Sequence, residues 1–264
     1  MSSLRLRQAV DMDKTPDAHL FALYCPDLSA LCKRCTVGTS FTVDERELVR
    51  RVVRVLRLRV GESLILFDRG QSADVSVQEL SSKKVVLQIE TLQRHAAAPE
   101  PIITLGLPIL KRKDLEEAIY AATEVGVNEI QLLETAKSGR LRSEAADLER
   151  LERIVVSACE QAKQFTLPTI HPPLALADWI ASAPRDAATI FFDPTGKPLG
   201  TIIEQLHKQK PGTVRLLIGP EADLTTDEKE LLRVNQVAFC KLTPTILQAH
   251  RAVAVACGAV RSLL

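Results

Sequence analysis

Two apolar runs in the last third of the chain end in short turns that could build a binding site. Residues 216–221 read Leu-Leu-Ile-Gly-Pro-Glu, and residues 237–242 lead into Thr-Pro-Thr-Ile-Leu at 243–247. A sequence that favours a helix follows each turn. In an open α/β sheet, ligands bind just beyond the carboxyl ends of the strands. The two turns therefore predict a small-molecule pocket in the C-terminal third of the chain.

Arginines crowd a short segment nearer the N-terminus, with apolar residues between them. They are Arg46, Arg50, Arg51, Arg54, Arg57 and Arg59. A guanidinium group is a preferred partner of phosphate, because its planar fork donates two hydrogen bonds at once. The apolar spacing predicts an amphipathic helix over 48–56 and an alternating, strand-like segment over 55–61. Two interpretations stay open for the charges: a solvated face over a small core, or a nucleic-acid contact surface.

The character of the sequence changes near residue 97, which predicts two domains. Before it, turn signals separate short strand-like segments at 64–67, 73–77 and 84–90. These predict a small all-β, barrel-like domain over 18–95. Residues 96–101, Ala-Ala-Ala-Pro-Glu-Pro, are typical of a linker.

From residue 102 to 264, apolar runs alternate with amphipathic stretches, which predicts an α/β domain with a parallel sheet. Two helix starts carry capping-box patterns, Asp114 with Glu117 and Thr225 with Glu228. Strands are expected at 102–107, 129–133, 188–192, 216–218 and 237–242, with a turn at 193–196. A long helix is expected at 144–163 and another helix at 200–208, and Pro168, Pro172 and Pro173 are expected to break the chain between them. The carboxyl ends of the parallel strands would then form one edge of the sheet.

Composition excludes several classes of protein. The 264 residues are 46% hydrophobic and 25% charged, with a formal net charge of +1, as in an ordinary globular protein. No apolar run approaches the ~20 residues that cross a bilayer. Residues 1–17 lack the apolar core of a secretory signal and are predicted to be a disordered leader.

The six cysteines indicate a reducing, cytoplasmic setting rather than a disulfide framework. Cys159, Cys240 and Cys257 fall in apolar helical or strand segments and are expected to be buried thiols. Cys32 and Cys35 have the spacing of a zinc knuckle, but a structural zinc needs four ligands and no second pair exists. No metal site is predicted.

Several motifs, in their order and spacing, resemble one family. They are Val55-Leu56-Arg57-Leu58 with Gly61-Glu62, Ala-Ala-Thr-Glu-Val-Gly-Val at 121–127, Ala-Cys-Glu-Gln-Ala at 158–162 before the prolines, Leu-Ile-Gly-Pro-Glu at 217–221, and Leu-Thr-Pro-Thr-Ile-Leu at 242–247. From about residue 20 onward the chain resembles the RsmE-type 16S ribosomal RNA uridine-N3 methyltransferases of the SPOUT superfamily. The resemblance implies a PUA-like β-barrel that binds RNA, followed by a trefoil-knotted parallel-sheet domain over 102–264.

The resemblance also implies ligands and partners. S-adenosylmethionine would lie in a bent form among three loops, and the protein would act as a homodimer on RNA of the small ribosomal subunit. The cofactor-binding residues would be Phe192, Asp193, Pro194, Leu217, Ile218, Gly219, Pro220, Leu242, Thr243, Pro244, Ile246 and Leu247. The RNA-binding residues would be Arg51, Arg54, Arg57, Glu160 and Gln161. For the last two, ordinary contacts near a helix end are an equal alternative.

The last loop departs from the family pattern and bears on the chemistry. Thr243 replaces a glycine, Thr245 and Gln248 replace arginines, His250 a glutamate and Arg251 a threonine. Methylation of uridine N3 requires loss of the N–H proton, and a general base contributes ~10²–10⁴-fold to such a step. His250 or Glu221 is the expected base, and Arg251 the expected RNA anchor. The alternative makes His250 a surface residue that caps a helix.

Two function classes remain open. The first is an S-adenosylmethionine-dependent ribosomal RNA methyltransferase. The second is a catalytically silent relative that binds RNA or assists ribosome assembly, which the altered last loop keeps open. A metabolic enzyme that binds a dinucleotide or a nucleoside triphosphate is disfavoured, because neither a Gly-x-Gly-x-x-Gly motif nor a Walker loop occurs.

Overall fold

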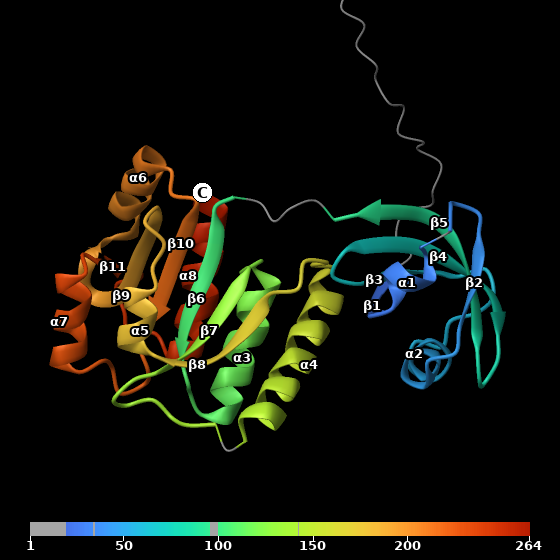
Figure 1. Cartoon of the computed structure of the whole chain (residues 1–264), viewed down its shortest axis with the longest axis horizontal. Helices are drawn as coiled ribbons and strands as arrows, with labels where there is room; N and C mark the ends of the chain where they lie inside the picture. Colours follow the sequence, from blue (N-terminus) through green and yellow to red (C-terminus); the bar gives the residue numbers. More distant parts are fainter. Residues whose placement is uncertain (1–19, 34, 96–99, 142) are drawn as a thin grey trace, which may run out of the picture.

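Two sheets form the body of the molecule (Figure 1). The N-terminal sheet has an apolar core of its own, and the main core of the C-terminal sheet extends to Ala22, Ile65 and Phe67 of the N-terminal sheet. The computed structural model describes residues 20–33, 35–95, 100–141 and 143–264. The predicted leader at 1–17 and most of the predicted linker, residues 96–99, lie outside the described residues. None of the helices described is both long and apolar enough to cross a membrane.

Five strands form the N-terminal sheet, in the order β1-β3-β4-β5-β2. β3, β4, β5 and β2 pair antiparallel, whereas β1 runs parallel to β3. Alternate residues of β4 and β5, such as Val75 and Leu87, point into one core, as the period of a strand requires. The elements are β1 Phe21–Tyr24, α1 Leu28–Leu31, β2 Ser40–Val43, α2 Arg46–Arg50, the π-helical η1 Arg51–Val55, β3 Ser63–Phe67, β4 Gln71–Leu80 and β5 Val85–Arg94.

The predicted strand over 55–61 is absent, and this corrects the sequence interpretation. The helix runs on to Val55 as a π-turn, and Leu58 then donates its backbone N–H to the carbonyl of Val52 at 3.1 Å. Arg57 takes a positive φ of 54° and Gly61 one of 87°. Since Val55 and Val60 are exposed, the alternation of apolar and charged residues produces no buried strand face.

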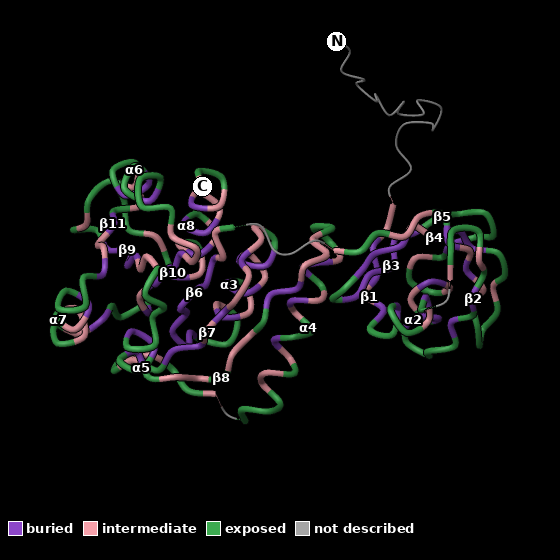
Figure 2. Tube along the Cα trace, turned by 45° about the horizontal axis from the view of Figure 1, so that its top comes forward, coloured by how far each residue is buried: buried purple, intermediate pink, exposed green. Residues whose placement is uncertain are grey.

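Six parallel strands form the C-terminal sheet, in the order β11-β9-β10-β6-β7-β8. Helices α3, α4, α6 and α8 cover one face, and α5 and α7 cover the other. The elements are β6 Ile102–Pro108, α3 Arg112–Glu124, β7 Glu129–Glu134, α4 Glu144–Ala162, β8 Thr169–Ala175, α5 Leu176–Ala181, β9 Ala187–Pro198, α6 Leu199–Gln209, β10 Thr213–Ile218, α7 Thr226–Val234, β11 Ala238–Lys241 and α8 Ala249–Leu263. Figure 2 shows buried residues following the central strands of this sheet.

The α/β alternation and the five predicted strands are confirmed, but a sixth strand was missed. β8 contains Pro172 and Pro173, which were expected to leave this segment without regular structure. A proline cannot donate to the sheet ladder, so it is tolerated only where one side of the strand is free. β8 is the edge strand next to β7, and it meets that condition.

Two predicted caps have different outcomes. The capping box of Thr225 and Glu228 at the start of α7 is confirmed. Asp114 does not cap α3, because that helix begins two residues earlier and its N-cap is Lys111, with no side-chain hydrogen bond. Asp114 therefore lies inside the first turn, where its carboxylate is free to face another element.

A bulge at the end of β9 replaces the simple turn expected at 193–196. Phe239 of β11 pairs with Phe191, whereas the next residue, Cys240, pairs with Lys197. The residues between bulge out of the ladder. Gly196 lies against the backbone of β11, where a Cβ atom would come 2.3 Å from the nitrogen of Cys240. Only glycine allows this approach, so it fixes the shape of the bulge.

Candidate active site

A cavity of about 580 Å³ opens beyond the carboxyl ends of β9, β10 and β11. The β9 bulge, the turn after β10 and the segment that joins β11 to α8 supply most of its wall. Ten of the twelve predicted cofactor-binding residues line it: Phe192, Asp193, Pro194, Ile218, Gly219, Pro220, Leu242, Thr243, Ile246 and Leu247. The structure thus brings three separate segments of the chain between residues 192 and 247 to one place.

The other two predicted residues do not line this cavity. Leu217 is fully buried and packs with Trp179 and Leu224 on the opposite face of the sheet. Successive strand residues point to opposite faces, so Ile218 faces the cavity and Leu217 cannot. Pro244 is exposed outside the lining.

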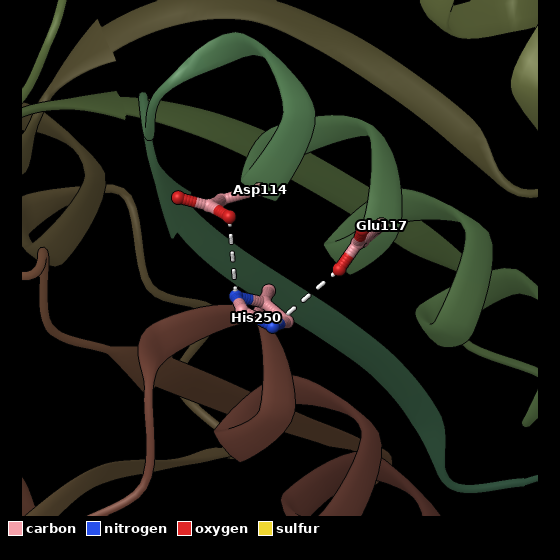
Figure 3. A group of neighbouring side chains, drawn as sticks. All are labelled: Asp114, Glu117 and His250. Carbon is pink, nitrogen blue, oxygen red and sulfur yellow. Dashed lines mark ion pairs between the residues drawn. The ribbon is translucent and has the colours of Figure 1, made fainter.

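His250 lies at the cavity wall, held between two carboxylates of α3 (Figure 3). Its Nδ1 is 3.5 Å from Oδ1 of Asp114, and its Nε2 is 3.4 Å from Oε2 of Glu117. Its side chain is only 15% exposed. The N-cap of α8 is Gln248, so His250 does not cap that helix, contrary to the alternative interpretation. Both ring nitrogens face carboxylates, which orients the imidazole.

The same three groups offer ligand atoms within 4.8 Å of one another, the one such set found among the described residues. The two carboxylates, however, face different nitrogens of the ring. They therefore flank His250 instead of converging with it on one ion (Figure 3). The geometry favours an oriented histidine over a metal centre.

The other two predicted catalytic residues have different positions. Glu221 is exposed and lines the cavity next to Pro220. Arg251 is exposed but does not line it, because it follows His250 on α8 and points from another side of the helix. Of the three, His250 and Glu221 are thus brought together at the cavity.

Sequence reasoning missed an ionic cluster that joins two residues of the cavity wall, Asp193 and Asp223, through Lys229. Nζ of Lys229 on α7 lies 2.7 Å from Oδ2 of Asp193 and 2.6 Å from Oδ2 of Asp223. Burial raises the pKa of Asp193, but hydrogen bonds from Lys229 and Thr195 outweigh it and hold that pKa below its usual range. Burial lowers the pKa of Lys229, but its two carboxylates hold it above the usual value.

Further cavity residues also lacked a signal of their own. They are Asp114, Asp223, Thr245, Gln248, Ala249 and Ala252. Thr245 lies within the predicted turn at 243–247, and position next to the predicted turns could have indicated those at 223 and 248–252. Asp114 could not have been found in this way, because it comes from a helix more than a hundred residues away in sequence.

The predicted RNA-binding residues separate into two groups. Arg51 donates two hydrogen bonds of 2.6 Å to the carboxylate of Glu160, and Tyr24 donates its backbone N–H to Oε1 of Glu160 at 2.9 Å. The hydrogen bonds to Glu160 raise the pKa of Arg51. Arg54, Arg57 and Gln161, in contrast, are exposed. Arg51 and Glu160 therefore connect the N-terminal and C-terminal parts of the molecule. The exposed Arg54 and Arg57 are the predicted arginines that remain accessible to a ligand.

Comparisons with known proteins agree with this architecture. A family model described as an RNA methyltransferase domain matches residues 98–261, and one described as an RNA methyltransferase PUA domain matches residues 52–90. Ribosomal RNA small subunit methyltransferase E from Synechocystis sp. is 29% identical over 80% of this chain and 69% of its own length. The protein of that name from Rickettsia conorii is 28% identical over 81% of this chain and 86% of its own.

Solved structures show the same fold. Ribosomal RNA small subunit methyltransferase E from Neisseria gonorrhoeae, bound to S-adenosyl methionine, has a TM-score of 0.79 at 24% identity, covering 93% of this chain and 98% of its own. A probable rRNA-methyltransferase from Porphyromonas gingivalis has a TM-score of 0.73 at 25% identity, covering 92% and 98%. With a family model over most of the chain and this fold around the cavity, the protein belongs to the RNA methyltransferase domain family, in its RsmE-type branch.

Proposed function

We propose that the protein transfers a methyl group from S-adenosylmethionine to N3 of a uridine in small-subunit ribosomal RNA. The observation that carries the proposal is the cavity of about 580 Å³ at the ends of β9, β10 and β11. Its volume lies within the ~300–1,000 Å³ of small-molecule sites. The relatives named ribosomal RNA small subunit methyltransferase E support the reaction and the substrate class.

The cavity wall offers apolar and acidic groups that suit the methyl donor. Phe192, Ile218 and Leu247 offer apolar surface on which an adenine ring can pack. Glu221 offers a carboxylate to a ligand that carries sulfonium and ammonium cations, and Asp223, paired with Lys229, adds to the negative charge of the wall. When bound, S-adenosylmethionine supplies the electrophilic methyl group. Cofactor binding is thus assigned to the ten lining residues predicted from the sequence.

His250 is the proposed general base. Asp114 and Glu117 orient its ring at the cavity wall, 3.5 and 3.4 Å from its two nitrogens. In the proposed step, one ring nitrogen leaves its carboxylate contact and accepts the proton of uridine N3, while the other carboxylate keeps the ring oriented and stabilises the imidazolium that forms. Glu221, in the turn after β10, is the alternative base. Arg251 lies on the same helix outside the cavity, where it can contact a phosphate of the RNA.

The RNA is proposed to lie along the exposed arginines of the N-terminal domain. Arg54 is exposed on η1, and Arg57 and Arg59 are exposed just after it. We further propose that the protein works in the cytoplasm. It is also proposed to act as a homodimer, because Ile246 at the cavity is 84% exposed and would be covered by a second copy. A trefoil knot of the C-terminal segment, also proposed, would hold residues 242–248 beside the turn after β10.

Calorimetric titration and a methylation assay test the proposal. The protein is titrated with S-adenosylmethionine and then incubated with small ribosomal subunits that lack the modification, followed by mass mapping of the nucleosides. Binding and a 3-methyluridine are expected, and His250→Ala is expected to lower kcat by ~10²-fold. The control is Glu230→Gln, on the outer side of α7. RNA binding without S-adenosylmethionine binding would instead identify a catalytically silent RNA-binding relative.

A further inference from the structure

We infer that Lys229 is a positioning residue whose single ammonium group ties two turns of the cavity into the shape that receives the methyl donor. The inference rests on the proposed function for the identity of the ligand. The tie itself consists of Lys229 on α7, Asp193 in the β9 bulge and Asp223 in the turn after β10. Both aspartates line the cavity.

The hydrogen bonds of Asp193 leave it dependent on Lys229. The side chain of Asp193 is 2% exposed, and its Oδ2 accepts from Nζ of Lys229 at 2.7 Å. Its Oδ1 accepts from the backbone N–H and the hydroxyl of Thr195, at 2.8 and 2.6 Å. Lys229 is therefore the cationic partner of a buried carboxylate. Without it, a buried negative charge would lack compensation, which a folded protein tolerates poorly.

Asp223 attaches the second turn to the same ammonium group. The backbone of Asp223 has a positive φ of 58°, in the left-handed region that residues other than glycine adopt only in a minority of cases. Its Oδ1 accepts from the backbone N–H of Leu224 at 2.7 Å, while its Oδ2 lies 2.6 Å from Nζ of Lys229. Its own N–H donates to the carbonyl of Pro220 at 2.9 Å. The carboxylate thus stabilises an unfavourable backbone conformation at the cavity wall.

The element that carries Lys229 is itself fixed in place. Thr225 and Glu228 form the capping box of α7, and Oε1 of Glu228 accepts from the backbone N–H of Ala136 at 2.7 Å. Leu232, one turn further on, is fully buried. The ammonium group is therefore presented from a rigid helix to two irregular segments. Such an arrangement pre-organises a binding site, because the segments need not be ordered by the ligand.

The charge balance of the tie suits the proposed ligand. Two carboxylates share one ammonium group, which leaves one net negative charge on this part of the wall, next to Glu221. If Lys229 were neutral, the two carboxylates would repel each other across the space it now fills. The two turns would then move apart, and the cavity between them would lose its shape.

Lys229→Met is the main test, since methionine keeps the apolar length of the side chain and removes the charge. Without ligand, hydrogen–deuterium exchange is expected to become faster in peptides that cover 192–197 and 219–225. The affinity for S-adenosylmethionine is expected to fall about tenfold, because the turns must then be ordered on binding. Lys229→Arg, which keeps the positive charge, is expected to keep both the exchange rate and the affinity closer to those of the unaltered protein. Glu230→Gln, on the same helix outside the cavity, is the matched control.

Asp223→Gly isolates one arm of the tie. Glycine accepts the positive φ, so the backbone of the turn is kept while the carboxylate is lost. Faster exchange is expected at 219–225 alone, with Asp193 still paired. If Lys229→Met fails to fold, Asp223→Gly is the test of the inference.

Unchanged exchange in both turns, in a folded Lys229→Met or in Asp223→Gly, would overturn the inference. Equal effects of Lys229→Met and Glu230→Gln would overturn it as well. If the unaltered protein binds no S-adenosylmethionine but the exchange still responds to Lys229→Met, the tie stands and the proposed function fails. The two hypotheses are therefore separated by one set of measurements.

Discussion

At the joint between the two domains and at the wall of the cavity, one charged side chain on a helix binds two partners, and the two charges have opposite sign. At the joint, one carboxylate, Glu160 of α4, accepts hydrogen bonds from the fork of Arg51 and from the backbone of Tyr24. At the cavity, one ammonium group, Lys229 of α7, serves Asp193 and Asp223. In both regions a helix presents one charge to two partners on other elements, so removal of that charge should weaken both contacts.

The two regions differ in what surrounds the charge. At the joint, aromatic rings pack beside the ion pair, with Phe67 and Phe165 centred 5.0 Å apart and Tyr24 5.7 Å from Phe67. At the cavity the wall is left open for a ligand. The joint is therefore expected to matter most for stability, and the tie of Lys229 most for binding.

Glu160→Ala should have the largest effect on stability. It leaves Arg51 and the N–H of Tyr24 without their acceptor, at a cost of about 2 kcal/mol, less than for a fully buried pair because Arg51 is 30% exposed. Urea unfolding measures the change. Gln161→Ala, at the next and exposed position, is the control. If both variants lose the same free energy of unfolding, the joint contributes no particular stability.

The pH dependence of stability should isolate the tie at the cavity. The pKa of Asp193 is lowered in the folded protein, so its stabilisation is present above its unfolded pKa, ~3.9, and is lost as the pH falls through the folded value. The pKa of Lys229 is raised, so its share is present below ~10.4 and is lost as the pH rises through the folded value.

Lys229→Met should therefore cost about 1–2 kcal/mol of unfolding free energy near pH 7 and progressively less in acid. Urea unfolding of both proteins at several pH values measures this difference. A difference that stays constant down to pH 3 would contradict the ionic account and indicate lost packing instead.

Thr225→Ala sharpens the comparison with an uncharged change on the helix that carries Lys229. Loss of the cap should cost about 1 kcal/mol. Because the ammonium group remains, the affinity for S-adenosylmethionine should fall less than in Lys229→Met. Thr226→Ala, at the exposed next position, is the control for stability. A loss of affinity as large as in Lys229→Met would show that the helix start, and not the charge, shapes the cavity.

Arg50→Ala should have the smallest effect. Arg50 contacts Glu47 with a fork much like that of the neighbouring Arg51, at 2.8 and 2.5 Å, but this pair is exposed to solvent. Water screens such a pair, so no measurable change in Tm is expected. A clear decrease in Tm would mean that the arginine segment is stabilised by its surface charges.

Prediction from the sequence succeeded where local chemistry decides the structure. The alternation of strands and helices after residue 101, the capping box of Thr225 and the burial of Cys159 follow from patterns within a few residues. It failed where a partner far along the chain decides. The segment 55–61 alternates like a strand but has no sheet neighbour, and the prolines of β8 are allowed because that strand lies at an edge.

The sequence by itself determined that two apolar strands end in short turns, and it predicted that those turns line a pocket. Only the tertiary structure decided which side chains face the cavity. The alternation of side chains along β10 points Leu217 away from the cavity. The fold places Asp114 next to His250, although more than a hundred residues separate them, and Lys229 joins two turns. The physical reason is that apolar periodicity and turn chemistry act locally, whereas the pairing of charges depends on which elements the folded core places side by side.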